Sequence, residues 1–162
     1  MTTLTQKQTI LSDDRRYRYQ LWREWLPSSG MDGGDVCFIG LNPSTADETS
    51  DDATIRKCIG FAKRWGKTSI CMVNLFAWRT TDPKDLARVP FPIGGDNDEH
   101  LQEIARTVPL VVAAWGNFPR YEWRAKQIRK LFGNLMCLGR CKNGSPRHPL
   151  YVPYEKGLES WE

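Results

Sequence analysis

The sequence predicts an α/β fold of three layers, in which helices cover both faces of a sheet of roughly four parallel strands. Four short segments are almost entirely apolar and lack the alternation of a half-exposed strand, which is typical of strands buried on both faces. Longer amphipathic stretches separate them, as right-handed helical crossovers between parallel strands require. The strands are predicted at 36–40, 69–74, 109–115 and 135–138.

The segments between the strands carry the start and stop signals of helices. Residues 15–26 follow Asp13 and Asp14, and their apolar side chains fall on one helical stripe. Asp51 and Asp52 precede a second helix, which is expected from about residue 53 to residue 65. Further helices are predicted at 81–88, 96–106 and 118–132.

Length and composition indicate a single globular domain. The 162 residues are expected to form one α/β unit, with residues 1–12 as a flexible N-terminal arm. Hydrophobic residues make up 40% and charged residues 26% of the chain, and no apolar run is long enough to span a bilayer. The polar N-terminus does not resemble a signal peptide, so we expect a soluble, cytoplasmic protein.

Cysteine and charge patterns exclude some classes of site. The five cysteines are odd in number and form no C-x-x-C pair, so we expect reduced, mostly buried thiols. The net charge of +4 and the pI near 8.9 are compatible with a polyanionic partner. The basic stretch 123–130 suits either a solvated helix face or a nucleic-acid contact. The acidic run 96–98 lacks the glycine and the distal glutamate of a calcium loop, and is better explained as a helix start.

Polar side chains follow three of the predicted strands. Asn42 follows the first strand, Asn74 ends the second with Arg79 close behind, and His148 comes after the fourth. Because ligands in α/β sheets bind beyond the carboxyl ends of parallel strands, we expect these side chains to meet in one cleft. Each also has a structural interpretation: Asn42 as a turn residue before proline, Asn74 as a cap, and His148 as a satisfied structural histidine.

Four motifs carry a resemblance to known proteins. They are Gly-Leu-Asn-Pro at 40–43, Asn-Leu-Phe-Ala-Trp-Arg-Thr at 74–80, Ala-Trp-Gly at 114–116 and His-Pro-Leu-Tyr at 148–151. In type and order they resemble the motifs of the uracil-DNA glycosylase superfamily, particularly its mismatch-specific branch, over about residues 35–153. The runs 40–47, 51–56 and 146–151 more closely resemble the bacterial and phage family called domain of unknown function 1643.

The glycosylase resemblance implies a protein that binds a flipped base in DNA and hydrolyses its N-glycosidic bond without a cofactor or metal. Asn42 matches the position that holds the attacking water, Asn74 the one that reads the base edge, and His148 the one that donates to the base oxygen. Asn42 stands where the family's water activator is an aspartate, so Asp47 is a candidate to activate water instead. Fixed donors suit this reaction because the departing base carries negative charge.

The resemblance also implies two groups of binding residues. A substrate-binding group follows the first two strands and comprises Gly40, Leu41, Pro43, Ser44, Asn74, Phe76, Trp78 and Arg79. Residues 44–50 lack the stacking aromatic of the superfamily, so Phe76 or Trp78 is expected to replace it. A nucleic-acid-binding group in the last loop comprises Lys142, Ser145, Arg147, Leu150 and Tyr151. Leu150 and Tyr151 are either an apolar wedge that enters the duplex or residues of the core or sheet edge.

Two further functions fit parts of the pattern. A non-catalytic module that binds nucleic acid or a nucleotide would need the cleft but no activated water. A metal-dependent phosphoester hydrolase would use Asp47, Asp51 and Asp52, but no histidine or carboxylate partner lies at ligand spacing. Asp51 and Asp52 are explained equally well as caps of the following helix.

Overall fold

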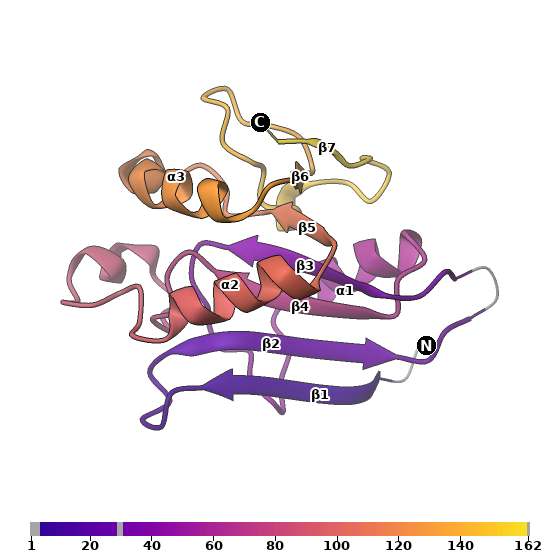
Figure 1. The fold of residues 1–162 in the computed structure, drawn as a ribbon, viewed down its shortest axis with the longest axis horizontal. Helices are drawn as coiled ribbons and strands as arrows, with labels where there is room; N and C mark the ends of the chain where they lie inside the picture. Colours follow the sequence, from indigo (N-terminus) through magenta and orange to yellow (C-terminus); the bar gives the residue numbers. More distant parts are fainter. Residues whose placement is uncertain (1–3, 29–30, 162) are drawn as a thin grey trace.

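The computed structural model describes residues 4–28 and 31–161, which form one seven-stranded sheet with three α-helices (Figure 1). The strands are β1 (Leu4–Leu11), β2 (Arg18–Trp25), β3 (Asp35–Gly40), β4 (Ser69–Asn74), β5 (Leu110–Ala113), β6 (Leu135–Cys137) and β7 (Glu159–Ser160). The α-helices are α1 (Ala53–Arg64), α2 (Asn97–Thr107) and α3 (Glu122–Leu131), and short 3-10 helices are η1 (Pro83–Ala87), η2 (Pro119–Tyr121) and η3 (Pro149–Tyr151).

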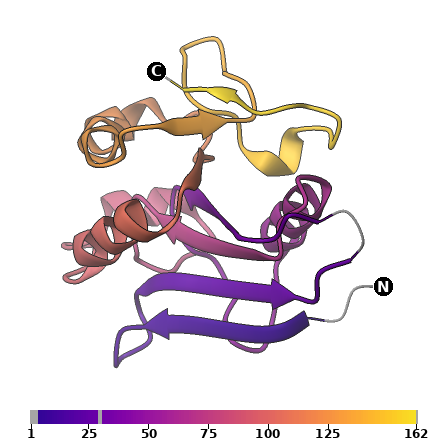
Figure 2. The same cartoon turned by 45° about the vertical axis from the view of Figure 1, so that its right-hand side comes forward.

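The sheet is mixed, with the order β1-β2-β4-β3-β5-β6-β7. The four central strands β4, β3, β5 and β6 run parallel to their neighbours. The hairpin β1–β2 adds antiparallel strands at one edge, and β7 adds one at the other (Figure 2). The α/β class is therefore confirmed, but the sheet is larger than predicted and is not parallel throughout.

Two predictions for the N-terminal region are wrong. Residues 15–26 do not form a helix, because residues 18–25 form β2, which pairs with β4. Most of the expected flexible arm is β1, whose partner is β2. The misleading signal was the four-residue spacing of Tyr17, Leu21 and Trp25, which fits one face of a helix and equally one face of a strand.

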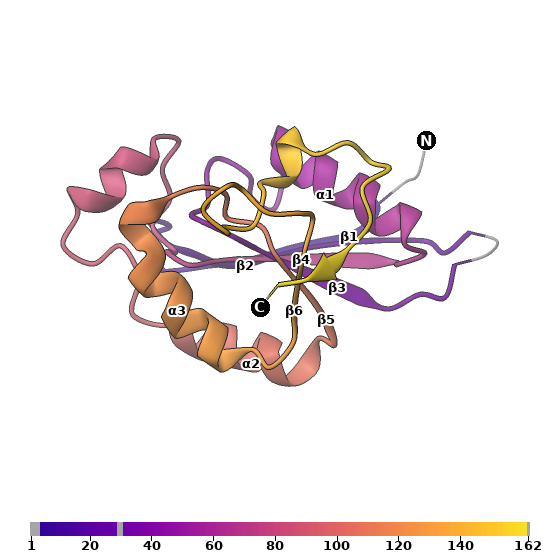
Figure 3. The same ribbon diagram turned by 90° about the horizontal axis from the view of Figure 1, so that it is seen from above.

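Helices cover both faces of the central strands (Figure 3). On one face, Ile55 and Phe61 of α1 belong to the same core cluster as Phe38 of β3. On the other face, Leu101 of α2 and Ile128 of α3 share a second cluster with Ile39 of β3. The uninterrupted apolar pattern of β3 follows from this arrangement, because neither face of the strand meets solvent.

The cysteines are free thiols, as predicted. Four of them are buried, namely Cys37, Cys58, Cys71 and Cys137. Cys141 is partly exposed. Burial raises the pKa of the Cys58 and Cys71 thiols, which keeps both protonated and unreactive.

None of the helices in the described part of the chain combines the length and the apolar character that crossing a bilayer would require.

Candidate functional site

The connections between the parallel strands diverge between β3 and β5. From β3 the chain crosses one face through α1 to reach β4, whereas α2 and α3 return it along the other face to β5 and β6. In open α/β sheets the carboxyl side of such a switch point is the usual ligand site. The carboxyl ends of β3 and β5, which point to the left in Figure 1, are therefore the place to look for chemistry.

Asn42 lies at this edge and its amide is held in one orientation. Its Nδ2 donates to the carbonyl oxygens of Pro43 at 3.0 Å and Thr80 at 2.9 Å. A carbonyl oxygen can only accept, so the amide is fixed with Oδ1 on the opposite side. In the described part of the chain no donor reaches Oδ1. The half-buried Asn42 thus presents a rigid hydrogen-bond acceptor, in addition to bracing its own turn.

Gly40 and Asn74 are opposite each other in the parallel pairing of β3 and β4. A Cβ at position 40 would lie 2.7 Å from the Asn74 Oδ1, so glycine is required for the two strands to approach. Asn74 is 3% exposed, and its Nδ2 is buried without a partner in the described residues. Such a group costs free energy unless something pairs with it, so Asn74 retains an unused donor beneath the edge.

Three residues of the predicted substrate-binding group are in the core. Leu41 and Phe76 belong to the cluster between the sheet, α2 and α3, and Phe76 contacts the ring of Tyr121. Pro43 is buried as well, and its carbonyl accepts from Thr80 N–H at 3.0 Å. Their side chains have packing roles and offer no surface for a ligand, so Phe76 does not replace the stacking aromatic.

Three other predicted residues share one cavity of about 440 Å³. Ser44 comes from the loop after β3, and Trp78 and Arg79 from the loop after β4. Its walls also include Arg15, Thr45 and Thr81. We call it the Arg79 cavity. Trp78 is half-buried, and its ring meets Tyr17 edge-on at 5.4 Å, which leaves Trp78 as the aromatic wall.

Asp47 organises the loop after β3. Its Oδ1 accepts from the backbone N–H and the hydroxyl of both Thr49 and Ser50, at 2.8 to 3.2 Å. These hydrogen bonds hold the pKa of the carboxyl well below its usual range. A carboxylate so strongly stabilised is a poor base, so the geometry does not favour Asp47 as the water activator.

Asp51 and Asp52 have structural roles that the sequence partly predicts. Asp52 caps α1, accepting from Ile55 N–H at 2.9 Å, and Asp51 pairs with the Arg23 Nε at 2.7 Å. No group of three or more histidine, cysteine or acidic side chains in the described residues is arranged to hold a metal ion.

Two buried arginines of β2, which sequence reasoning missed, support this loop. Arg23 is fully buried and also donates to the carbonyl oxygens of Asp47 and Ser50. Arg18 is 3% exposed and donates to the Ala46 carbonyl at 3.0 Å. Burial lowers the pKa of Arg18 to about 10. The positive charges of Arg79 and Arg23 also lower this pKa, whereas the negative charge of Asp52 raises it. Arg18 and Arg79 are therefore close enough for their positive charges to interact.

His148 lies on the β5 side of the edge. Gly116, just after β5, has a φ of +82°, and a Cβ there would lie 3.4 Å from the His148 Cβ. The His148 Nδ1 accepts from the Leu150 N–H at 3.2 Å, so in the neutral ring the proton is on Nε2. Burial lowers the pKa of His148, and Asp52 opposes the shift. The ring is thus neutral near pH 7 and carries a hydrogen-bond donor at Nε2.

Leu150 and Tyr151 are exposed, which excludes the interpretation that these two side chains form part of the core. Leu150 is 36% exposed and Tyr151 is 76% exposed, and both belong to η3. Arg147 donates to the Tyr151 carbonyl at 3.1 Å and so steadies this turn. Lys142 is exposed, as expected for a phosphate contact, whereas Ser145 lines a different cavity beside α3.

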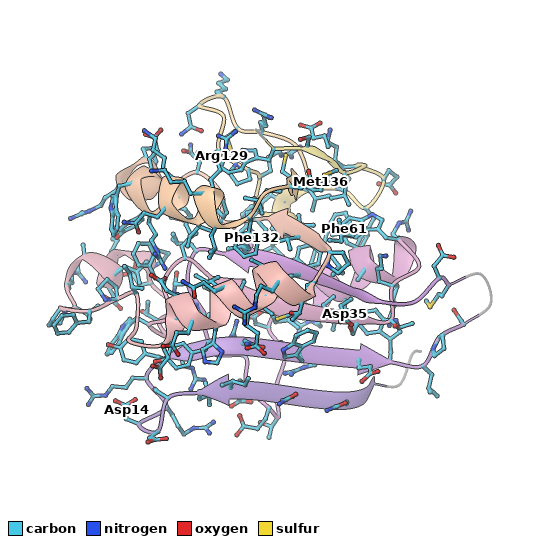
Figure 4. The ribbon with its side chains drawn as sticks, viewed as in Figure 1. Asp14, Asp35, Phe61, Arg129, Phe132 and Met136 are labelled. Carbon is cyan, nitrogen blue, oxygen red and sulfur yellow. The ribbon has the colours of Figure 1, made fainter. Side chains whose placement is uncertain are left out.

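The basic helix is only partly available to a partner. Arg124 is 1% exposed, bonded to the Leu75 carbonyl at 2.9 Å and to Asp98 at 2.5 Å. Arg129, labelled in Figure 4, lies over the Trp161 ring at 4.8 Å. These two cations serve packing, so the structure favours the interpretation of α3 as mainly a structural helix.

The sequence predicts that Asn42, Asn74 and His148 meet in one cleft, whereas the structure places them in two groups, with no hydrogen bond between His148 and either asparagine in the described part of the chain. Asn42 and Asn74 lie on the β3–β4 side, where Asn42 bonds the Thr80 carbonyl beside the Arg79 cavity, and His148 lies beside Gly116 on the β5 side. The two sides meet where Ala114 N–H donates to the Ile39 carbonyl at 2.9 Å.

Comparison with known families supports the closer of the two resemblances, the one to domain of unknown function 1643. A family model described as "Protein of unknown function (DUF1643)" matches residues 18–150. The chain belongs to this family. The DUF1643 match spans β2 through the His148 loop and so includes every candidate residue except Tyr151. No curated protein and no solved structure matches the chain.

Proposed function

We propose that the chain binds a nucleobase of DNA at the carboxyl edge of β3 and β5 and hydrolyses its N-glycosidic bond, in the manner of uracil-DNA glycosylases. The observation that carries the proposal is the complementary polarity of two fixed side chains. Asn42 offers an acceptor at Oδ1, and His148 offers a donor at Nε2. These are the two groups that the reaction needs, one in the loop after β3 and the other directly before η3.

The chemistry follows from where charge develops. As the bond between C1′ and the base breaks, the base takes the electron pair and the sugar becomes cation-like. His148 Nε2–H donates to the base oxygen on which negative charge accumulates, and this interaction strengthens in the transition state. Asn42 Oδ1 accepts a hydrogen bond from water and aims its oxygen at C1′. The water supplies hydroxide to the sugar, and its proton leaves to the base or to solvent.

The neutral state of His148 matters to this role. A neutral ring can donate a hydrogen bond to the departing anion. An imidazolium would also be attracted to the phosphates of DNA. Burial and the hydrogen bond from Leu150 N–H both favour the neutral ring with its proton on Nε2. The unpartnered Nδ2 of Asn74 adds a second donor that a bound base would satisfy.

The exposed η3 turn supports access to a base within a duplex. Leu150 and Tyr151 project next to His148, and their exposure has no stabilising effect on the isolated protein. An apolar side chain of this kind fills the gap left when a nucleotide leaves the stack.

A second candidate, binding without catalysis, is favoured by the state of Asp47. Its four hydrogen bonds and lowered pKa leave Asn42 without a competent base nearby, so water is positioned but not activated. Hydrolysis would then be slow or absent, and the edge would serve to recognise a base.

The test is base release from defined oligonucleotides in the presence of EDTA. Duplexes carrying uracil, mismatched thymine or a hypermodified base are incubated with the protein, and abasic sites are detected by alkaline strand cleavage. We expect Asn42→Ala and His148→Ala each to lower the rate about 10²- to 10³-fold, the usual effect of losing one transition-state donor or acceptor. His100→Ala is the matched control.

The outcomes separate the candidates. Base release that depends on Asn42 and His148 supports hydrolysis. Binding that survives EDTA without base release supports the non-catalytic module. Strand cleavage that EDTA abolishes would overturn both in favour of a metal-dependent phosphoester hydrolase.

A further inference from the structure

The Arg79 cavity contains more positive charge than its surroundings neutralise. Two of its arginines are paired: Arg15 contacts Glu48 at 3.0 Å, and Arg16 lies 3.9 Å from Asp14. Arg79 has no carboxylate within 4.0 Å in the described part of the chain, and its NH1 donates only to the Arg15 carbonyl, at 3.0 Å. Its Nε is buried and has no partner among the described residues.

Arg18 of β2 is a second, buried cation whose charge interacts with that of Arg79. It forms no ion pair with a described residue, its Nε is buried without a partner among them, and its side chain donates to the Ala46 carbonyl. Arg79 contributes to lowering its pKa, so the two guanidinium groups repel each other. An anion in the cavity would relieve this repulsion.

Other residues that line the Arg79 cavity supply neutral donors. Ser44, Thr45 and Thr81 line the cavity, and their hydroxyls have no partner in the described part of the chain. The backbone N–H groups of Ser44 and Thr45 are also free of described backbone partners. By contrast, the Thr80 hydroxyl is committed to Asp85, at 2.7 Å. Free hydroxyls, free N–H groups and an unpaired guanidinium are the donor set that binds phosphate.

An aromatic wall completes the site. Trp78 lines the same cavity as Arg79, and the volume of about 440 Å³ exceeds what a phosphate alone needs. We infer that the Arg79 cavity binds the phosphoryl group of a nucleotide, with Arg79, Ser44 and Thr45 on the phosphate and Trp78 beside the attached sugar or base. The identity of the ligand as a nucleotide rests on the proposed function, whereas the presence of an anion site does not.

The test is isothermal titration calorimetry at low salt with matched probes. Deoxyuridine 5′-monophosphate, deoxyuridine and inorganic phosphate separate the contributions of phosphate and nucleoside, and a single-stranded oligonucleotide presents the same phosphate within DNA. We expect the nucleotide to bind at least tenfold more tightly than the nucleoside, and its affinity to fall as salt rises.

The decisive variant is Thr45→Glu, which places a carboxylate in the cavity. Thr45 is exposed and makes no hydrogen bond with the described residues, so the fold should tolerate the change. We expect Thr45→Glu to weaken nucleotide binding at least tenfold more than Thr45→Gln, which has a similar size, loses the same hydroxyl and adds no charge. Arg79→Ala should also lose at least tenfold, and the exposed Arg120→Ala should lose nothing.

Equal binding of nucleotide and nucleoside, no binding of any phosphate probe, or equal behaviour of Thr45→Glu and Thr45→Gln would overturn the inference. Sensitivity to Thr45→Glu seen only with the oligonucleotide supports it and assigns the phosphate to DNA. If the cavity binds phosphate but the protein releases no base, only the glycosylase proposal is rejected. If the protein releases a base but the phosphate does not contribute to binding, only this inference is rejected.

Discussion

The two sides of the carboxyl edge are held in different ways. On the β3–β4 side, buried Arg18 and Arg23 reach from β2 to fix the loop that carries Asn42 and Asp47. On the β5 side, His148 lies in a loop held by backbone hydrogen bonds, such as that from Gly116 N–H to the Pro146 carbonyl at 3.0 Å. The first side is thus suited to binding a charged group in a fixed place. The second exposes apolar side chains and is suited to meeting an external surface.

The largest expected effect comes from removing the support under the first side. Arg23→Ala would remove the partner of the Asp51 carboxylate and of the Asp47 carbonyl oxygen, and should lower the free energy of unfolding by about 3–5 kcal/mol. Urea denaturation measures the change. The control is Arg56→Ala, because the exposed Arg56 also contacts Asp51, donating to the Asp51 carbonyl oxygen at 2.9 Å. This substitution should cost about 1 kcal/mol or less. Equal losses in both variants would contradict the comparison.

The contact between β3 and β4 should show the next largest effect. Gly40→Ala brings a Cβ to 2.7 Å from Asn74 Oδ1, in a fully packed interior, and should cost about 1–3 kcal/mol. Asn74→Ala removes the obstacle, so the double variant should be more stable than the sum of the single changes predicts. Strict additivity in a double-mutant cycle, measured by urea denaturation, would show that the two residues do not constrain each other.

The β5 side should respond to pH through His148. Burial lowers its pKa below the ordinary value of 6.5, so below that pH the unfolded chain binds a proton that the folded chain excludes. Stability should therefore decrease as pH falls from 6.5 towards the folded-state pKa. His148→Asn keeps a side-chain acceptor for Leu150 N–H and should flatten this decrease in melting temperature between pH 7.5 and 5. An unchanged slope would contradict a buried, neutral ring.

The smallest effect on stability is expected at the η3 turn. Leu150→Ala and Tyr151→Ala remove exposed surface and should each change the free energy of unfolding by about 0.5 kcal/mol or less. If the turn meets DNA, both variants should nevertheless weaken binding to a duplex with a mismatched base, measured by fluorescence anisotropy. A large loss of stability would instead mean that the turn belongs to the core.

How far the sequence predicts this structure depends on the range of the interactions involved. The strand β4 and the Asp52 cap of α1 were predicted because buried strands and caps leave signals within a few residues. The strand β2 was missed because Arg18 and Arg23 look like exposed residues, and their partners lie 24 to 28 positions further along the chain.

The same reasoning explains what was missed at the site. The type and place of Asn42 and His148 can be predicted from local motifs, but the direction of their amide and imidazole protons depends on Thr80, Pro43 and Leu150. The cavity around Arg79 requires three loops to meet, and Arg18, whose charge interacts with that of Arg79, belongs to a strand that the sequence predicted to be a helix.

The most direct test of the central claim is long-range ¹H–¹⁵N NMR of the protein labelled at its two histidines, with and without a uracil-containing oligonucleotide. We predict that His148 at pH 7 is neutral with its proton on Nε2, and that the oligonucleotide shifts the Nε2 signal while leaving that of His100 unchanged. A proton on Nδ1, or a His148 signal that does not respond at saturation, would contradict the account.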